Sequence, residues 1–157
     1  MIRRAQPPDL NNLQTLFADT LRTICIADYT PAQIEVWASS IQNTSRWLDK
    51  IDRQYFLVYV EHQQILGFGS LESGHYIDMF YIHNQYQRKG IGKQIYLELE
   101  AEAHRIQQDQ IPLTLSAHVS YTALPFFSRM GFLMEHENMV RMGEYELVNY
   151  LMKKQLI

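Results

Sequence analysis

The chain has 157 residues, of which 46% are hydrophobic and 20% charged, and this length fits one globular domain over residues 1–157. Its 17 acidic and 14 basic residues give a net charge of −3, which excludes a protein that attracts nucleic acid or anionic lipid through its overall field. One cysteine excludes an internal disulfide, and the N-terminus lacks the apolar run of a secretory signal, so we expect a cytoplasmic protein. The longest apolar runs are strand-sized, so no membrane segment is expected.

The first fifty residues are predicted to contain one short strand and two helices. Residues 2–5 form the strand candidate, which ends at the QPPD run, with Asp9 as the N-cap of the next helix. Apolar residues at helical spacing predict an amphipathic helix over residues 9–25. A second helix begins at Thr30-Pro31, where Thr30 is the N-cap and Pro31 occupies the first turn.

The rest of the chain is predicted to form strands and two further helices. The strand candidates are residues 55–60, 65–71, 75–82, 113–119, 132–141 and 145–152, and the helix candidates are residues 90–108 and 122–130. Gly131 follows the last helix as its C-cap. The resulting order β-α-α-β-β-β-α-β-α-β-β predicts a mixed α/β domain.

The segment QRKGIGK at residues 87–93 lies between a predicted strand and a long predicted helix. Its glycines allow the backbone to approach a ligand, and the N–H groups at the helix start attract anions. Arg88, Lys89 and Lys93 add positive charge to this loop. The segment therefore predicts a phosphate or pyrophosphate site.

Two familiar phosphate-binding loops do not fit this segment. A P-loop requires a glycine five places before Gly92, where Gln87 stands, and a Ser or Thr at position 94, where Gln94 stands. A dinucleotide fingerprint that starts at Gly90 requires a small residue at the position of Ile95.

The pattern that fits is Q-x-x-G-x-G, from Gln87 to Gly92. Together with FYI at residues 80–82, the helix after the loop and PFFSRMGF at residues 125–132, it resembles the GNAT superfamily of acyl-CoA-dependent N-acetyltransferases over nearly the whole chain. This resemblance implies the GNAT fold, which has a mixed, mostly antiparallel central sheet flanked by helices. It also implies acetyl-CoA as the cosubstrate.

The resemblance further implies which residues bind the cofactor. In the family, the strand before the loop diverges from the next parallel strand, and the pantetheine arm lies in the gap. The residues expected to contact the arm and thioester are Phe80, Tyr81, Ile82, Ser120 and Phe127. The residues expected to hold the pyrophosphate are Gln87, Arg88, Lys89, Gly90, Ile91, Gly92 and Lys93.

An amine must be neutral to attack a thioester, and free alkylamines have a pKa near about 10, so a base or a water relay is required. Strand alternation places four residues on one face of the strand 75–82: Tyr76, Asp78, Phe80 and Ile82. Asp78 is the first candidate for the base, Tyr76 is a second catalytic candidate, and Glu72 and His75 are alternatives. A purely structural role for Asp78 stays open.

The leaving group departs from the family pattern. Many members carry a Tyr that protonates the CoA thiolate at the position of Phe127, and phenylalanine cannot donate a proton. Ser120 replaces an Asn that is frequent in the family. Tyr121 or Tyr81 could reach the sulfur, and a thiolate with a pKa of about 8.5 could leave without an acid.

Other reactive side chains have alternative interpretations. Cys25 could carry an acyl group or be a buried apolar residue, and His118 could face the site or pack in the fold. The six histidines show no ligand spacing, so no metal is expected.

We therefore expect an N-acetyltransferase that transfers the acetyl group of acetyl-CoA to a primary amine of a small molecule or peptide by direct attack. The alternative is a catalytically silent GNAT-like module that binds acyl-CoA in a sensor or assembly role, because the usual Tyr is missing. Trp37, Trp47 and Tyr29 would belong to the core or form the wall of a groove, and an aromatic wall would suit an apolar or aromatic amine. No nucleic-acid partner is expected, and a homodimer stays open.

Overall fold

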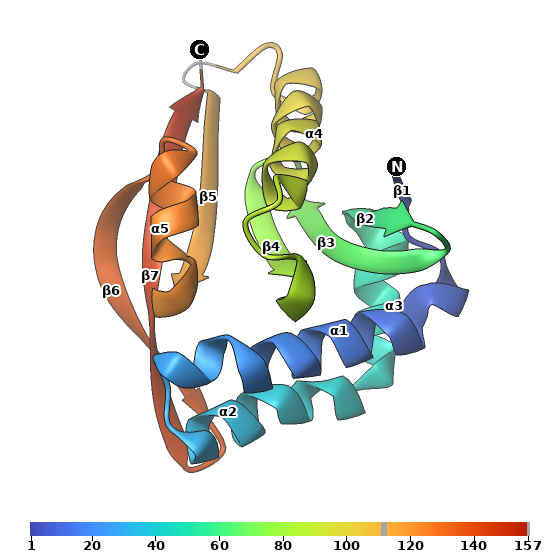
Figure 1. Cartoon of the computed structure of the whole chain (residues 1–157). Helices are drawn as coiled ribbons and strands as arrows, with labels where there is room; N and C mark the ends of the chain where they lie inside the picture. Colours follow the sequence, from blue (N-terminus) through green and yellow to red (C-terminus); the bar gives the residue numbers. More distant parts are fainter. Residues whose placement is uncertain (111–112, 157) are drawn as a thin grey trace.

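Seven strands form one sheet in the order β1-β2-β3-β4-β5-β7-β6 in the computed structural model, which describes residues 1–110 and 113–156 (Figure 1). The strands are β1 (Ile2–Arg4), β2 (Tyr55–Glu61), β3 (Gln64–Glu72), β4 (Tyr76–Ile82), β5 (Leu113–Ser120), β6 (Leu133–Met142) and β7 (Tyr145–Leu156). Neighbouring strands run antiparallel except β4 and β5, which are parallel. The expected mixed, mostly antiparallel sheet is thus confirmed.

Helices cover both faces of the sheet. They are α1 (Leu10–Thr23), α2 (Pro31–Ala38), α3 (Thr44–Arg53), α4 (Ile91–Ile106) and α5 (Leu124–Arg129). Short 3-10 turns are η1 (Pro7–Asp9), η2 (Cys25–Ala27), η3 (Ser39–Gln42), η4 (Asn84–Tyr86) and η5 (Tyr121–Ala123). Figure 1 shows α4 beside β3 and β4, and α5 beside β5 and β7, so these two helices flank the middle of the sheet.

Two hydrophobic cores lie on opposite faces of the sheet. The α4-side core includes Ile91, Ile95, Leu99, Leu115, Ala117, Phe127 and Met152. The α1-side core includes Leu13, Phe17, Leu21, Ile34, Trp47, Phe56, Phe68 and Met79. Which core a strand residue joins therefore tells us toward which set of helices it points.

The start of α2 forms as the sequence predicts. Thr30 has extended backbone, and its hydroxyl accepts a hydrogen bond of 3.1 Å from the Gln33 N–H. The Gln33 side-chain oxygen in turn accepts from the Thr30 N–H at 2.9 Å, and Pro31 follows the cap. This reciprocal pair satisfies two N–H groups that the first turn would otherwise leave unpaired.

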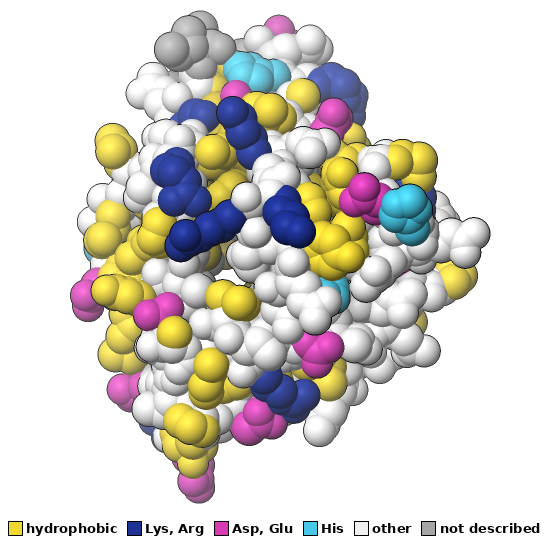
Figure 2. Space-filling view, viewed as in Figure 1, with side chains coloured by type: hydrophobic (Ala, Val, Ile, Leu, Met, Phe, Trp, Pro, Cys, Tyr) yellow, Lys and Arg dark blue, Asp and Glu magenta, His cyan; other side chains and the backbone are white. Residues whose placement is uncertain are grey.

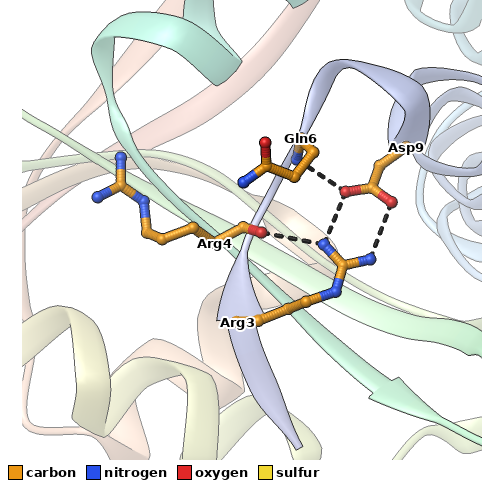
Figure 3. A network of polar contacts seen from close by, with 4 residues as sticks. All are labelled: Arg3, Arg4, Gln6 and Asp9. Atoms are coloured by element: carbon orange, nitrogen blue, oxygen red, sulfur yellow. Dashed lines mark hydrogen bonds and ion pairs between the residues drawn. The ribbon is translucent and has the colours of Figure 1, made fainter.

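The prediction for Asp9 is wrong in its detail. Its side chain makes no capping bond to α1 and instead accepts two hydrogen bonds of 2.9 Å from the Arg3 guanidinium and one of 2.8 Å from the Gln6 N–H (Figure 3). The Arg3 hydrogen bonds, more than any other cause, lower the pKa of Asp9. The carboxylate thus joins β1 to the turn that leads into α1.

The structure contains one helix that the sequence analysis did not predict, α3. The Asn43 side chain caps it by accepting a hydrogen bond of 3.2 Å from the Arg46 N–H. Trp47 and Ile51 lie one turn apart and are buried, while most of the other residues of α3 are exposed or half-buried. The helix has ten residues, and its apolar residues Trp47, Leu48 and Ile51 span little more than one turn, so it lacks the long apolar repeat of α1 and α4.

Strands β4 and β5 pair over a short distance and then diverge. Their ladder consists of Tyr76 with Ser116 and Ile77 with Ala117. At the closed end of the gap, the buried Gln107 side chain donates to the Gly74 carbonyl at 2.7 Å and to the Thr114 carbonyl at 2.8 Å. The Thr114 N–H donates back to the Gln107 side-chain oxygen at 3.2 Å. One amide therefore fixes β4 next to β5 where their ladder begins.

A β-bulge interrupts β4. Ser70 of β3 pairs with Met79, but the next residue, Leu71, pairs with Ile77, so Asp78 is the extra residue. Ile77 accordingly joins the α4-side core and Met79 joins the α1-side core, although the two are separated by one residue. Before the bulge the odd-numbered Ile77 faces α4, and after it the odd-numbered Met79 and Tyr81 face α1.

The bulge overturns the predicted common face of β4. Phe80 and Ile82 pack against the α4-side core, whereas Tyr81 packs against the α1-side core. Tyr76 and Asp78 interact with residues on the opposite side of the sheet from Phe80 and Ile82. The prediction that all four residues share one face is thus wrong, because strict alternation assumes that no residue is inserted.

Candidate active site

A cavity of about 390 Å³ opens where β4 and β5 diverge. Its walls come from α1, α2 and α3, from the facing parts of β4 and β5, and from the β6–β7 hairpin. Aromatic side chains dominate the lining: Phe17, Tyr29, Trp37, Trp47, Tyr76, Phe80, Tyr81 and Phe127. The charged or titratable side chains of its lining, besides tyrosines, are Arg46, Lys50, Asp78 and His118. A volume of this size suits a small organic group.

The loop between β4 and α4 has the backbone of an anion site. Arg88 and Gly90 adopt left-handed φ angles of +61° and +84°, and Gly90 is the residue before α4. No side chain caps the N-terminus of α4, so the first N–H groups of this 16-residue helix remain available to a ligand. A Cβ built on Gly90 would meet no atom within 4 Å, which leaves the loop open toward solvent.

Gln87 holds the start of this loop. Its side-chain N–H group donates to the Ile82 carbonyl at 2.7 Å, so the loop is tied back to the end of β4. Arg88, Lys89 and Lys93 are exposed beside it. Figure 2 shows Lys and Arg side chains gathered on the face that carries α4 and α5, in a molecule whose net charge is −3.

Gly92 permits close packing of α4 against α5. A Cβ on Gly92 would lie 3.1 Å from Phe126 and 3.5 Å from Phe80. The Phe80 ring lies 5.1 Å from the Phe126 ring and 5.6 Å from the Phe127 ring. Gly92, the second glycine of the predicted phosphate loop, thus allows α4 and α5 to pack closely. Ile91 beside it is buried in the α4-side core.

Asp78 is held by two residues of the unpredicted α3 region. Its carboxylate forms an ion pair with Lys50 and accepts a hydrogen bond of 2.9 Å from the Gln54 side chain. The side chains of Lys50 and Asp78 are only 15% and 18% exposed, respectively. The negative charge of Asp78 is therefore balanced by Lys50 within the cavity wall.

Tyr76 and His118 form a second polar pair in the cavity. The Tyr76 hydroxyl lies 2.9 Å from His118 Nδ1, across the diverging strands. Burial raises the pKa of Tyr76. Tyr76 is half-buried and His118 is exposed.

The residues at and around the position of the missing general acid lie in different environments. Phe127 is buried in the α4-side core and lines the cavity, and Ser120 lines it while its hydroxyl accepts from the Ala123 N–H at 3.2 Å. Tyr81 also lines the cavity, and burial raises its pKa. Tyr121 is 54% exposed and is not part of the cavity wall.

Tyr29 is a further cavity residue whose polar contacts the sequence did not reveal. Its hydroxyl donates to the Val148 carbonyl at 2.8 Å and accepts from the Tyr121 N–H at 2.9 Å. The aromatic wall predicted for Tyr29, Trp37 and Trp47 is present, since all three line the cavity.

Cys25 lies in the α1-side core, and burial raises the pKa of its thiol to about 11. A thiol with this pKa is protonated at neutral pH, which disfavours an acyl-cysteine route. Among the residues that the structure describes, no three or more His, Cys, Asp or Glu side chains are grouped so that they could hold a metal ion. In the same residues, no helix has both the length and the apolar character needed to cross a membrane.

Lys50 and Arg46 are the charged cavity residues that the sequence analysis missed. They are four residues apart, so both lie on the same side of α3. The Asn43 cap and the spacing of Trp47 and Ile51 are the signals that could have revealed this helix.

Comparison with known proteins gives the same family at several levels. The family model described as "Acetyltransferase (GNAT) domain" matches residues 25–154. The uncharacterized N-acetyltransferase YafP of Escherichia coli (strain K12) is 30% identical over 152 residues, covering 97% of this chain and 93% of YafP.

Solved structures share the fold over nearly the whole chain. A GCN5-related N-acetyltransferase from Rhodopseudomonas palustris, also described as "Aminotransferase, Class-II", has a TM-score of 0.92 at 26% identity, covering 99% of this chain and 95% of that one. The PaiA N-acetyltransferase from Thermoplasma acidophilum, solved with coenzyme A, has a TM-score of 0.80 at 21% identity, covering 99% and 98%. The chain therefore belongs to the GNAT acetyltransferase family.

Proposed function

We propose that this protein transfers the acetyl group of acetyl-CoA to a primary amine of a small molecule or peptide by direct attack. The observation that carries the proposal is the divergence of β4 and β5, which opens the aromatic cavity. Strand β4 lines this cavity and leads through the loop into the N-terminus of α4, which no side chain caps. One strand thus joins a site for a small organic group to a site for phosphates.

The phosphate part of acetyl-CoA would bind at the loop. Gln87, Arg88, Lys89, Gly90, Ile91, Gly92 and Lys93 are the residues that we assign to it. The left-handed backbone at Arg88 and Gly90 and the free N–H groups of α4 support this assignment, because the backbone can approach a pyrophosphate there. PaiA, which has the same fold, was solved with coenzyme A, and the acetyltransferase YncA from Salmonella typhimurium was solved with acetyl-CoA.

The pantetheine arm and the thioester would lie in the gap between β4 and β5. The ladder between these strands ends at Ile77 and Ala117, so the facing backbone beyond it is free of strand pairing. The residues that we assign to the arm are Phe80, Tyr81, Ile82, Ser120 and Phe127. A backbone N–H group directed at the thioester oxygen would stabilise the oxyanion, and one such donor is worth about 3–4 kcal/mol.

Direct attack requires that the acceptor nitrogen reaches the thioester through the cavity. The cavity supports this route, because it lies between residues of α1–α3 on one side and β4 and β5 on the other. Aromatic walls favour an amine with an apolar or aromatic body. Asp78 is the first candidate for the base, and its Oδ2 is occupied by the ion pair with Lys50 and by the hydrogen bond from Gln54.

Thiol release from acetyl-CoA, measured with phenethylamine, spermidine and alanyl-phenylalanine, tests this proposal. We expect CoA to bind and at least one amine to release thiol at a rate well above buffer. Calorimetry with CoA measures binding separately. Binding without thiol release for any of the three amines would instead support the silent acyl-CoA-binding module. No binding of CoA would contradict both functions.

A further inference from the structure

We propose that Tyr76 and His118 form a proton relay that removes the proton from the attacking amine, an inference that rests on the proposed function. The 2.9 Å contact between the Tyr76 hydroxyl and His118 Nδ1 carries it. Tyr76 belongs to β4 and His118 to β5, so the pair joins the two strands at the closed end of the gap in which the thioester would lie.

Strand geometry directs both side chains into the cavity. Ile77 on β4 and Ala117 and Val119 on β5 are buried in the α4-side core. Their neighbours Tyr76 and His118 therefore lie on the other face, where both line the cavity. The bridge pairs of β4 and β5 are the last point at which the two strands touch, so the relay lies at the inner end of the gap.

The other basic candidate of the cavity is already engaged. Asp78 is paired with Lys50 and accepts a hydrogen bond from Gln54. Among the described residues, no salt bridge involves His118, and its imidazole retains one hydrogen-bond contact, the one with Tyr76. A neutral imidazole has a lone pair on its unprotonated nitrogen, which makes it able to act as a base.

Tyr76 transfers protons without becoming an anion. Burial raises its pKa, so its neutral form predominates at neutral pH. In the resting relay, the Tyr76 O–H donates to His118 Nδ1, and the imidazole carries its own proton on Nε2. The hydroxyl oxygen then remains free to accept a proton from the amine.

The proposed step conserves every proton and electron pair. The amine lone pair forms the C–N bond to the thioester carbon, and the C–S electron pair leaves on the CoA sulfur. One amine proton passes to the Tyr76 oxygen as the Tyr76 hydroxyl proton passes to His118 Nδ1. The imidazolium then releases its extra proton to solvent, which it can do because His118 is exposed.

The charges around the relay come from four strands and one helix. They are Glu72 on β3, Asp78 on β4, Glu135 and His136 on β6, Lys153 on β7, and Arg46 and Lys50 on α3. Lys153 pairs with Glu135 at 3.2 Å, and Lys50 pairs with Asp78. Glu72 is opposite Tyr76 in register and is exposed.

The kinetic test uses His118→Gln, Tyr76→Phe and, as control, His62→Gln, which changes an exposed histidine in the turn between β2 and β3, outside the cavity. The acceptor is the fastest of the three amines named above, and kcat is measured against pH. We expect both cavity variants to lose about 10²-fold or more in kcat with an unchanged KM for acetyl-CoA. In His118→Gln, the acid limb of the wild-type profile should also disappear, while His62→Gln should keep it.

A spectroscopic test examines the relay without turnover. Long-range proton–nitrogen NMR on labelled protein reports the tautomer and titration of His118. We expect the Nε2–H tautomer in the wild type and a shifted titration midpoint in Tyr76→Phe. An Nδ1–H tautomer, or an acid limb that persists in His118→Gln, would overturn the relay while leaving acetyl transfer intact. Absence of thiol release from the wild type would overturn the proposed function itself.

Discussion

At the scale of single residues, the backbone of Gly90 is the most direct test of the phosphate loop. Its φ of +84° is unfavourable for any L-residue, by roughly 1–2 kcal/mol. We expect Gly90→Ala to weaken CoA binding at least fivefold, because the loop relaxes away from the conformation that presents its N–H groups. Calorimetric titration with CoA measures this.

Gly143 provides a matched control for that variant. It has a φ of +59° in the β6–β7 turn, so Gly143→Ala imposes a similar backbone cost at a place remote from the loop. Its CoA affinity should equal that of the wild type. Equal losses of CoA affinity in Gly90→Ala and Gly143→Ala would show that the effect comes from general destabilisation of the fold.

Asp9 allows a prediction about pH. Its pKa is lowered in the folded protein by the Arg3 hydrogen bonds, so it stabilises the fold at pH above its unfolded value of about 3.9. This contribution is lost as the pH falls through the lowered folded pKa. We expect Asp9→Asn to reduce the free energy of unfolding by about 1–3 kcal/mol at pH 7, and by less at pH 3.5.

Urea denaturation at the two pH values measures this difference. The control is Asp49→Asn, which removes the exposed Asp49–Arg53 pair of α3 and should cost under about 1 kcal/mol. A loss for Asp9→Asn that does not change with pH would contradict an ionic role for its carboxylate.

At the scale of secondary-structure elements, Gln107 fixes the closed end of the β4–β5 gap. Replacing it by Leu leaves the Gly74 carbonyl and both backbone groups of Thr114 without this partner. We expect Gln107→Leu to lower the free energy of unfolding by about 2–4 kcal/mol. Thermal denaturation checks this, with the exposed neighbour Gln108→Leu as the control, for which we expect almost no change.

Elements with a long apolar repeat or a clear cap or turn signal were predictable from sequence, and α3 was not. The α4 helix was expected at 90–108 and is found at Ile91–Ile106, because Ile91, Ile95 and Leu99 repeat along one buried side. The α3 helix was missed, since its burial rests on Trp47 and Ile51 alone. Lys50 and its pairing with Asp78 depend on α3 and were therefore not predicted either.

The candidate site was predictable where it depends on a continuous motif. Gln87 to Gly90 form a loop and Ile91 to Lys93 the first turn of α4, so the motif stays together in the structure. Gly90 lies where the backbone is left-handed, and Gly92 lies where α4 packs closely against Phe126. The pairing of Tyr76 with His118 joins residues 42 positions apart. It depends on the register of β4 and β5, which a single sequence does not specify.

At the scale of the whole molecule, the sheet is joined in its middle by a ladder of two residue pairs. A ligand in the gap would connect the two halves, and binding to the folded state alone raises stability. We therefore expect CoA to slow hydrogen exchange in the diverging parts of β4 and β5, around residues 79–82 and 118–120. Exchange measured by mass spectrometry tests this.

Adenosine 3′,5′-bisphosphate is the control ligand for this experiment, because it carries phosphates without a pantetheine arm. It should protect the segment around Gly90 and leave the strand edges unchanged. Equal protection of the strands by both ligands would contradict a pantetheine site between β4 and β5.

The bulge at Asp78 has a consequence for how this chain is aligned and engineered. Deleting that one residue would restore the regular ladder and leave Tyr76 and Ile77 on their present faces, but it would remove the carboxylate that pairs with Lys50 and Gln54. In a relative without the bulge, an alignment with no gap at this point would match Tyr76 with a residue on the other face of the sheet. Relatives that differ in length at this point should be compared by strand register, and grafts of β4 into other scaffolds must keep the inserted residue.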